Sequence, residues 1–243
     1  MTTMSIDTAP LAGQPATHPV GGTDTGPTAS AFDGMRHAMV ASQLRTNAVN
    51  DQRVVAAMAR VPREAFMPQA VRSIAYRDTA IPLGGGRYAN LPMATGRLLT
   101  EAYLTATDRV LLIGAATGYT AAVLSEIVAS VVAVESDPAL IATARAALAG
   151  VGNVDLVEGA MQDGSAAGPL YDVLVVDGAV ETLPDALIAQ VRPGGRVVAG
   201  ISERGLTRLA SGRKTEGGFA LAAFVDVECV VLPGFDTPKP FKF

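Results

Sequence analysis

Residues 109–135 read Arg-Val-Leu-Leu-Ile-Gly-Ala-Ala-Thr-Gly-Tyr-Thr-Ala-Ala-Val-Leu-Ser-Glu-Ile-Val-Ala-Ser-Val-Val-Ala-Val-Glu. Two apolar runs are separated by Gly114-x-x-x-Gly118 and a helical pattern, and the second run closes on Glu135. An open parallel sheet holds an adenosine-containing ligand with such a unit, because the glycines let the backbone approach and the acid accepts hydrogen bonds from ribose hydroxyls. The stretch therefore predicts a site for a nucleoside cofactor.

The alternation of strand and helix continues beyond this stretch. Strands are predicted near 110–113, 131–134, 153–157, 172–176 and 196–200, and helices near 119–128, 138–148 and 183–190. Two strand-like runs follow, at about 206–210 and 219–232, separated by a polar turn. Alternation that ends in a hairpin predicts an α/β, Rossmann-like fold. We expect a mostly parallel twisted sheet with helices on both faces and a C-terminal antiparallel β-hairpin.

The N-terminal part of the chain has a different character. Residues 1–30 carry too little apolar surface to offset their ordering entropy, so we expect a disordered tail. Residues 31–104 are expected to form a helical cap, and residues 105–243 the cofactor-binding domain. Within the cap, helices are predicted from Phe32, at Gln52–Arg60 behind an Asn50 or Asp51 cap, and at Met93–Leu104, with an irregular segment at 76–97.

The irregular segment contains a loop at 84–92, Gly-Gly-Gly-Arg-Tyr-Ala-Asn-Leu-Pro. Three successive glycines leave its backbone mobile, so we expect the loop to lie over the cofactor and to gate it by closing.

Composition excludes several classes of function. The formal net charge is −4, which gives no electrostatic reason to expect nucleic acid or an anionic membrane as partner. Cys229 is the only cysteine and His18 and His37 are the only histidines, so neither an intramolecular disulfide nor a metal site is expected. No apolar stretch approaches the ~18–20 residues that span a bilayer, and the N-terminus does not read as a secretory signal. We expect a cytoplasmic protein. The oligomeric state is left open.

The spacing of the glycines bears on the choice of cofactor. Nicotinamide dehydrogenases use G-x-G-x-x-G, whereas Gly114-Ala-Ala-Thr-Gly118 lacks the middle glycine that lets a pyrophosphate approach. A terminal β-hairpin is typical of methyltransferases of this fold class. S-adenosylmethionine is therefore favoured, and a nicotinamide oxidoreductase stays as a distant alternative.

The chain resembles the protein-L-isoaspartate O-methyltransferase family over about residues 35–200. The motifs that carry the resemblance occur in family order: Met39-Val-Ala-Ser-Gln-Leu-Arg45, Asn50-Asp-Gln-Arg-Val54, Val61-Pro-Arg-Glu-Ala-Phe-Met-Pro68, Ala75-Tyr-Arg-Asp78, the glycine turn, Asn153-Val154, and Leu183-Pro184 to Pro193-Gly-Gly195. The resemblance implies a class I S-adenosylmethionine-dependent methyltransferase that methylates the α-carboxylate of an isoaspartyl residue and so starts protein repair. The acceptor would be a protein or peptide, or a small-molecule carboxylate.

The loop at 84–92 departs from the family pattern G-x-G-Q-T-[IV]-S-x-P. Arg87, Tyr88 and Asn90 stand where the family has Gln, Thr and the active-site Ser. Asn90 has an amide that can donate hydrogen bonds in place of the Ser. Arg87 has a guanidinium that could clamp an acceptor carboxylate by two bonds. Each could equally be an ordinary loop residue.

Asn90, Tyr88 and Asp177 are the predicted catalytic residues. A carboxylate acceptor is already ionised at pH 7 and needs no general base. A nitrogen or hydroxyl acceptor needs one, and Asp177 at the end of a strand is the candidate, although capping a turn would explain it equally well.

The cofactor-binding residues predicted from the motif and the resemblance are Ala89, Gly114, Ala115, Gly118, Tyr119, Glu135, Ser136, Ala160 and Met161. Leu112, Ala160 and Asn90 stand where the family has polar residues. A catalytically degenerate relative that acts as a binding or regulatory module is therefore kept as the alternative.

Overall fold

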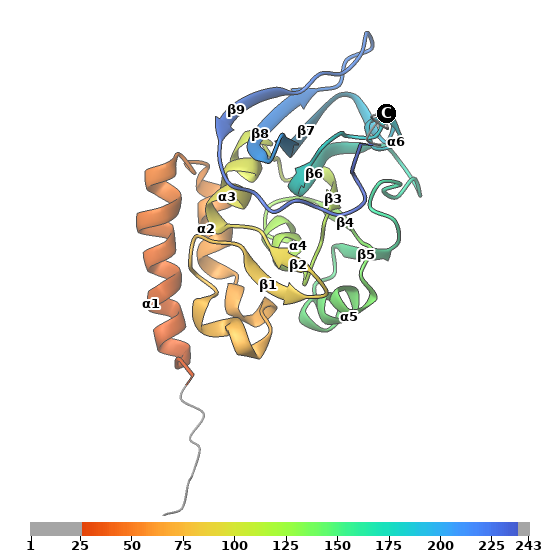
Figure 1. The fold of residues 1–243 in the computed structure, drawn as a ribbon. Coiled ribbons are helices and arrows are strands. Elements are labelled where there is room, and N and C mark those ends of the chain that lie inside the picture. The colour runs from red at the N-terminus through yellow and green to blue at the C-terminus, as the bar shows by residue number, and fades with distance from the viewer. Residues whose placement is uncertain (1–25, 238–243) are drawn as a thin grey trace, which may run out of the picture.

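The computed structural model describes residues 26–237, whose main feature is a seven-stranded sheet in the order β5-β4-β3-β6-β7-β8-β9 (Figure 1). Its strands are β3 (Arg109–Ile113), β4 (Ser130–Glu135), β5 (Val154–Glu158), β6 (Tyr171–Val180), β7 (Val191–Glu203), β8 (Leu206–Arg213) and β9 (Ala222–Asp226). Strands β3 to β7 are parallel to their neighbours, and β8 and β9 are antiparallel. The predicted mostly parallel sheet with an antiparallel C-terminal hairpin is confirmed.

The order of the strands creates a crevice at one edge of the sheet. From β3 the chain moves outward through β4 to β5, then crosses back to pair β6 with the other side of β3. Ligands of open α/β sheets bind where the strand order reverses in this way, outside the carboxyl ends of the strands. The glycine turn follows β3, Glu135 ends β4 and Asp177 lies in β6, so all three are at this edge.

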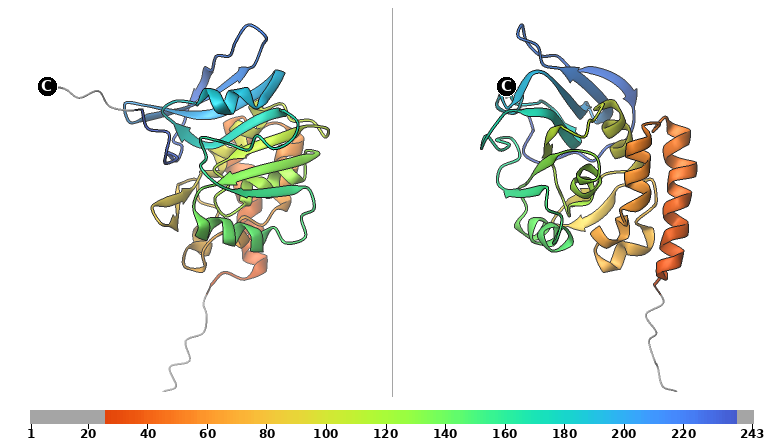
Figure 2. Two further views of the ribbon diagram at one scale, coloured as in Figure 1. Left: turned by 90° about the vertical axis from the view of Figure 1, so that its right-hand side faces the viewer. Right: turned by 180° about the vertical axis from the view of Figure 1, so that it is seen from behind.

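Successive side chains of β3 point to opposite faces of the sheet and enter two apolar clusters. Val110 and Leu112 belong to a large cluster that includes residues of α2 (Gln52–Arg60), α3 (Pro92–Glu101), α4 (Tyr119–Ser125) and α5 (Pro138–Ala147). Leu111 and Ile113 belong to a smaller one with α6 (Asp185–Ala189) and the C-terminal segment. Helices thus cover both faces as predicted, and Figure 2 shows the N-terminal helices together on one side.

The N-terminal helices begin at the capping residues that favour such starts. Helix α1 (Ala29–Met39) is capped by Thr28, whose side chain accepts a hydrogen bond from Ala31 N, and α2 is capped by Asp51 in the same way. The remaining helical segments of this part are η1 (Val40–Leu44), η2 (Arg45–Asn47), η3 (Arg63–Phe66) and η4 (Gln69–Ile74). Helix α2 has the predicted bounds.

Two predictions for the N-terminal part differ from the structure. Helix α1 starts at Ala29, so the predicted tail of residues 1–30 extends slightly too far, because Thr28 already provides a cap. The first 25 residues of that tail lie outside the described part of the chain. The segment predicted as irregular contains an antiparallel hairpin, β1 (Ile81–Gly84) and β2 (Arg87–Ala89), which forms a small sheet of its own. Strands this short leave too few residues for a period to be recognised in the sequence.

The chain after β9 does not continue as a strand to residue 232, as the sequence had suggested. Residues 227–235, here called the C-terminal segment, turn back and run beside the end of β6. Ala179 N donates to Val230 O at 2.6 Å, and Leu232 N donates to Ala179 O at 2.8 Å. The segment thereby brings Leu232 to the crevice. Within residues 26–237, no helix combines the length and the apolar character needed to cross a bilayer.

The close packing of β6 against β7 can be tested at Gly200. A Cβ there would lie 2.7 Å from the carbonyl oxygen of Gly178 and 2.9 Å from Cα of Ala179. Because backbone cannot yield cheaply, we expect Gly200→Ala to lower the free energy of unfolding by about 1–3 kcal/mol in urea denaturation. Gly152→Ala is the control, since no atom lies within 4 Å of its Cβ position. Equal unfolding midpoints for the two variants would contradict the packing described.

Candidate active site

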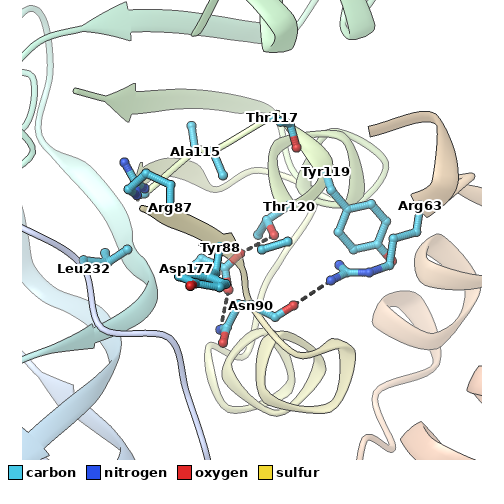
Figure 3. Close-up of a pocket in the computed structure, with 13 residues that line it drawn as sticks. Arg63, Arg87, Tyr88, Asn90, Ala115, Thr117, Tyr119, Thr120, Asp177 and Leu232 are labelled. Carbon is cyan, nitrogen blue, oxygen red and sulfur yellow. Dashed lines mark hydrogen bonds between the residues drawn. The ribbon is translucent and has the colours of Figure 1, made fainter. Parts of the chain in front are cut away.

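The crevice holds a small cavity of about 20 Å³, room for roughly one water molecule (Figure 3). Four parts of the chain surround it: the start of η3, the β1–β2 hairpin with the residues after it, the glycine turn into α4, and the crevice edge of β6 with the C-terminal segment. The residues that line it are Arg63, Arg87, Tyr88, Ala89, Asn90, Gly114, Ala115, Ala116, Thr117, Tyr119, Thr120, Asp177 and Leu232.

The glycine turn after β3 depends on backbone angles that side chains disfavour. Gly114 and Gly118 have φ of 82° and 98°. A Cβ at Gly118 would also lie 2.9 Å from Cδ1 of Leu148, and one at Gly114 would lie 3.0 Å from Cδ1 of Leu232. Both glycines are therefore needed by the turn itself and by the close packing around it.

Glu135 ends β4 with its side chain fully buried, and its carboxylate is surrounded by donors. Ala116 N donates to Oε2 at 2.8 Å, and the backbone N–H groups of Ser136 and Asp137 donate to Oε1 at 2.8 and 3.0 Å. Arg87 completes the shell with an ion pair in which Nη1 donates to Oε1 and Nη2 to Oε2, the latter at 3.0 Å. Glu135 is therefore an enclosed and paired acid, not a solvated one at the end of a strand.

Asp177 is the second carboxylate of the crevice, and it too is surrounded by donors. Asn90 Nδ2 donates to Oδ1 at 2.9 Å and Thr95 Oγ1 at 2.8 Å, while Thr120 Oγ1 donates to Oδ2. The Asn90 side chain also accepts a hydrogen bond from Val230 N at 3.2 Å. Asp177 and the C-terminal segment together fix the orientation of the Asn90 amide, as Figure 3 shows for the bond to Asp177.

Arg63 reaches the cavity from η3 although only 1% of its surface is exposed. Its Nη2 donates to Asn90 O at 2.6 Å and its Nε to Ala75 O at 2.8 Å, and its guanidinium lies 4.7 Å from the ring centre of Tyr119. Burial lowers the pKa of Arg63 and raises the pKa of Tyr119 to about 12. The Tyr119 hydroxyl is buried beside the Arg63 guanidinium, without a hydrogen bond of good geometry to any group in the described part of the chain.

Most of the residues predicted for the site lie together. Around the cavity are Tyr88, Ala89, Asn90, Gly114, Ala115, Tyr119 and Asp177. Gly118 and Ser136 support the site through backbone, as the N-cap of α4 and as a donor to Glu135. Ala160 and Met161 follow β5 and do not line the cavity; Met161 is 1% exposed, within the smaller apolar cluster.

Six residues of the site were missed at the sequence level: Arg63, Thr95, Ala116, Thr117, Thr120 and Leu232. Ala116 and Thr117 lie between the predicted Ala115 and Gly118, within the same turn. Thr120 follows the predicted Tyr119 directly, and Arg63 lies in one of the family motifs, so both had a usable signal. Thr95 and Leu232 reach the crevice only through tertiary packing, and no local pattern marks them.

The sequence of this chain is similar to that of a known protein family. The sequence profile described as Protein-L-isoaspartate(D-aspartate) O-methyltransferase (PCMT) matches residues 35–234. The chain belongs to this family. The match includes Asn90, just after the β1–β2 hairpin, and all but the last residue of the C-terminal segment that contacts it.

Individual relatives of this chain carry the name of the same family. Protein-L-isoaspartate O-methyltransferase 1 of Rhodopseudomonas palustris strain HaA2 is 41% identical over 172 residues, 70% of this chain and 70% of the relative. A second one, from strain CGA009, is 36% identical over 209 residues, 83% of this chain and 96% of the relative. A solved protein-L-isoaspartate O-methyltransferase has a TM-score of 0.72 at 23% identity; the match covers 84% of this chain but only about two thirds (66%) of that longer one.

Family membership confirms the predicted enzyme class, an S-adenosylmethionine-dependent methyltransferase, and the predicted class I fold. A Plasmodium falciparum structure assigned to the same enzyme, in complex with S-adenosyl-L-homocysteine, shares the fold with a TM-score of 0.66 at 16% identity, covering 83% of this chain and 97% of that one. The alternative of a degenerate binding module is not favoured.

The crevice has glycines and an acceptor carboxylate that suit this cofactor, but it lacks the free space for it. The glycine turn allows close backbone approach, and Glu135 places a carboxylate at the end of β4, the kind of acceptor that binds ribose hydroxyls in this fold class. The Arg87 guanidinium, however, lies on the Glu135 carboxylate, and the remaining cavity of about 20 Å³ is far smaller than the roughly 300–1,000 Å³ of ordinary ligand pockets.

The environment of the Tyr119 hydroxyl predicts how its removal changes the free energy of unfolding. Tyr119→Phe removes a buried group that makes no hydrogen bond of good geometry, so we expect the free energy of unfolding to stay the same or to rise by up to about 1 kcal/mol. Tyr76→Phe is the matched comparison: it removes a hydroxyl that donates to Glu64 and accepts from Arg36, and it should lose about 1–3 kcal/mol. Urea denaturation of both variants tests this. A larger loss for Tyr119→Phe than for Tyr76→Phe would contradict the arrangement.

Proposed function

We propose that this chain methylates the α-carboxylate of isoaspartyl residues in proteins or peptides, the first step in repairing such damage. The single observation that carries the proposal is the arrangement of Asn90. Its amide is fixed by Asp177 and by the C-terminal segment, and it faces the same cavity as the glycine turn beside Glu135. The names of the relatives support the same acceptor.

Some residues around the crevice would bind the cofactor, and others would bind the acceptor. The turn Gly114–Gly118 and the Glu135 carboxylate would hold the nucleoside. S-adenosylmethionine, when bound, supplies a methyl group on a positively charged sulfur. The protein contributes alignment and the exclusion of water, which are the main demands of a transfer to an oxygen that is already ionised.

Asn90 is proposed as the residue that contacts the acceptor carboxylate. One of its two amide N–H groups donates to Asp177, and the other, for which the Cys229 sulfur competes, is the one that would donate to a carboxylate oxygen. Arg63 fixes the backbone at this position by donating to Asn90 O. Asn90 would thus perform the orienting task that the family assigns to a serine.

Asp177 is proposed as a positioning residue. Its two oxygens already accept hydrogen bonds from Asn90, Thr95 and Thr120, so their acceptor positions are largely occupied by the protein itself. An acceptor that needs no general base fits this arrangement better than an amine or a hydroxyl. Tyr88, 47% exposed beside the cavity, is proposed to contact the peptide around the acceptor.

The predicted cytoplasmic location is retained as part of the proposal. It is supported by the single cysteine, Cys229, which is buried and whose pKa burial raises to about 12. Neither nucleic acid nor membrane is proposed as a partner, given the formal net charge of −4.

A methyl-transfer assay tests the proposal directly. With radiolabelled S-adenosylmethionine, we expect an isoaspartyl peptide to be methylated and the same peptide with ordinary aspartate not to be. Asn90→Ala should lower kcat/KM about tenfold or more, since an orienting hydrogen bond to an ionised group contributes about 1.5–3 kcal/mol. Asn47→Ala, at an exposed position on η2, should leave the rate unchanged. Equal labelling of both peptides, or none of either, would refute the proposed acceptor.

A further inference from the structure

We propose that Arg87 is an internal competitor of the cofactor: it holds the β1–β2 hairpin closed on Glu135, and nucleoside binding requires this ion pair to open. The inference rests on the proposed function, because it assumes that Glu135 is the ribose acceptor. It goes beyond that function in assigning regulation of the site to one residue.

The closed arrangement is built from a buried ion pair. The Arg87 side chain is 8% exposed and that of Glu135 is fully buried, and the guanidinium binds both carboxylate oxygens. Such two-bond pairing is the geometry that arginine forms best with a carboxylate. Glu135 is the only acid that pairs with Arg87 in the part of the chain that the structure describes.

The ion pair and a bound ribose exclude each other because Glu135 has no free acceptor position. Its two oxygens already accept six hydrogen bonds: two from Arg87, three from backbone N–H groups and a long one, at 3.5 Å, from the Ser136 hydroxyl. A carboxylate offers about four lone-pair sites. The backbone donors belong to the turn and to the start of α5 and stay in place, so Arg87 is the partner that a ribose hydroxyl would replace.

The β1–β2 hairpin can move away from the crevice as a unit and take Arg87 with it. Its two strands pair only with each other and are not part of the main sheet. Gly84, Gly85 and Gly86, which lead into Arg87, all have positive φ, from 58° to 98°, where other residues are strained. A Cβ at Gly85 would lie 3.1 Å from Oδ2 of Asp137, so the turn of the closed hairpin rests against the residue that caps α5.

The consequence is a coupling between hairpin opening and cofactor affinity. A guanidinium deprived of its carboxylate is costly to keep buried, so Arg87 should leave the crevice together with the hairpin. The apparent affinity for the nucleoside is then reduced by the fraction of molecules that are open. A member of the family with glutamine at this position has no such charge to displace.

Calorimetric titration with S-adenosylhomocysteine tests the proposal on the full chain. We expect Arg87→Gln to bind at least tenfold more tightly than the wild type, and Arg87→Lys, which cannot form two parallel bonds, to lie between them. Arg60→Gln is the control, because Arg60 forms an exposed ion pair with Glu126 and neither residue lines the cavity. Equal or weaker binding by Arg87→Gln overturns the proposal.

A second measurement needs no ligand. Hydrogen exchange of the backbone amides at 81–91 should be faster in Arg87→Gln than in the wild type, and unchanged exchange overturns the proposal. The outcomes separate this inference from the proposed function: if isoaspartyl peptide is methylated but Arg87→Gln binds no more tightly, only the competitor role fails. If neither protein binds S-adenosylhomocysteine or transfers methyl groups, both fail.

Discussion

The carboxylate of Glu135 is the constraint around which the crevice is organised. Parallel strands bring the end of β4 beside the turn that follows β3, and there the side chain is fully buried. A buried charge must be paired and hydrogen-bonded, or it destabilises the fold. Backbone N–H groups of the turn and of the chain entering α5 supply part of this compensation, and Arg87 supplies the opposite charge. The need to compensate this buried charge therefore holds the β1–β2 hairpin against Glu135.

The second carboxylate, Asp177, connects the cap to the sheet. It lies in β6, yet its donors come from the loop after β2, from α3 and from α4. Asn90 extends the network to the C-terminal segment, and Arg63 extends it to η3. Segments far apart in the sequence thus determine the orientation of one amide group. In such a network the individual hydrogen bonds reinforce one another, so the acceptor side of the site is held as a unit.

Local patterns in the sequence were sufficient for much of the fold. The unit from β3 to β4 follows from its apolar runs and glycines, and α2 from Asp51 and its amphipathic spacing. The hairpin was not predicted, because β1 and β2 are too short for a period to be visible. The C-terminal segment was predicted as strand because its apolar residues look alike whether they pair in a sheet or, like Leu232, cover a crevice.

Site residues could be predicted where a sequence motif marks them. They could be predicted much less well where only tertiary contacts bring them to the crevice. Glu135 and the turn glycines carry a spacing that has a physical reason. Arg87 was considered as a clamp for an acceptor carboxylate; in the structure its two bonds go to Glu135 instead, a partner 48 positions away. No local pattern links two such positions.

The most direct test of this account is a crystal structure of the protein with S-adenosylhomocysteine, in which the distance from the Arg87 guanidinium to the Glu135 carboxylate is measured. The account predicts that ribose hydroxyls take the place of Arg87 and that the hairpin has moved with its arginine. A bound nucleoside beside an intact Arg87–Glu135 ion pair would contradict it.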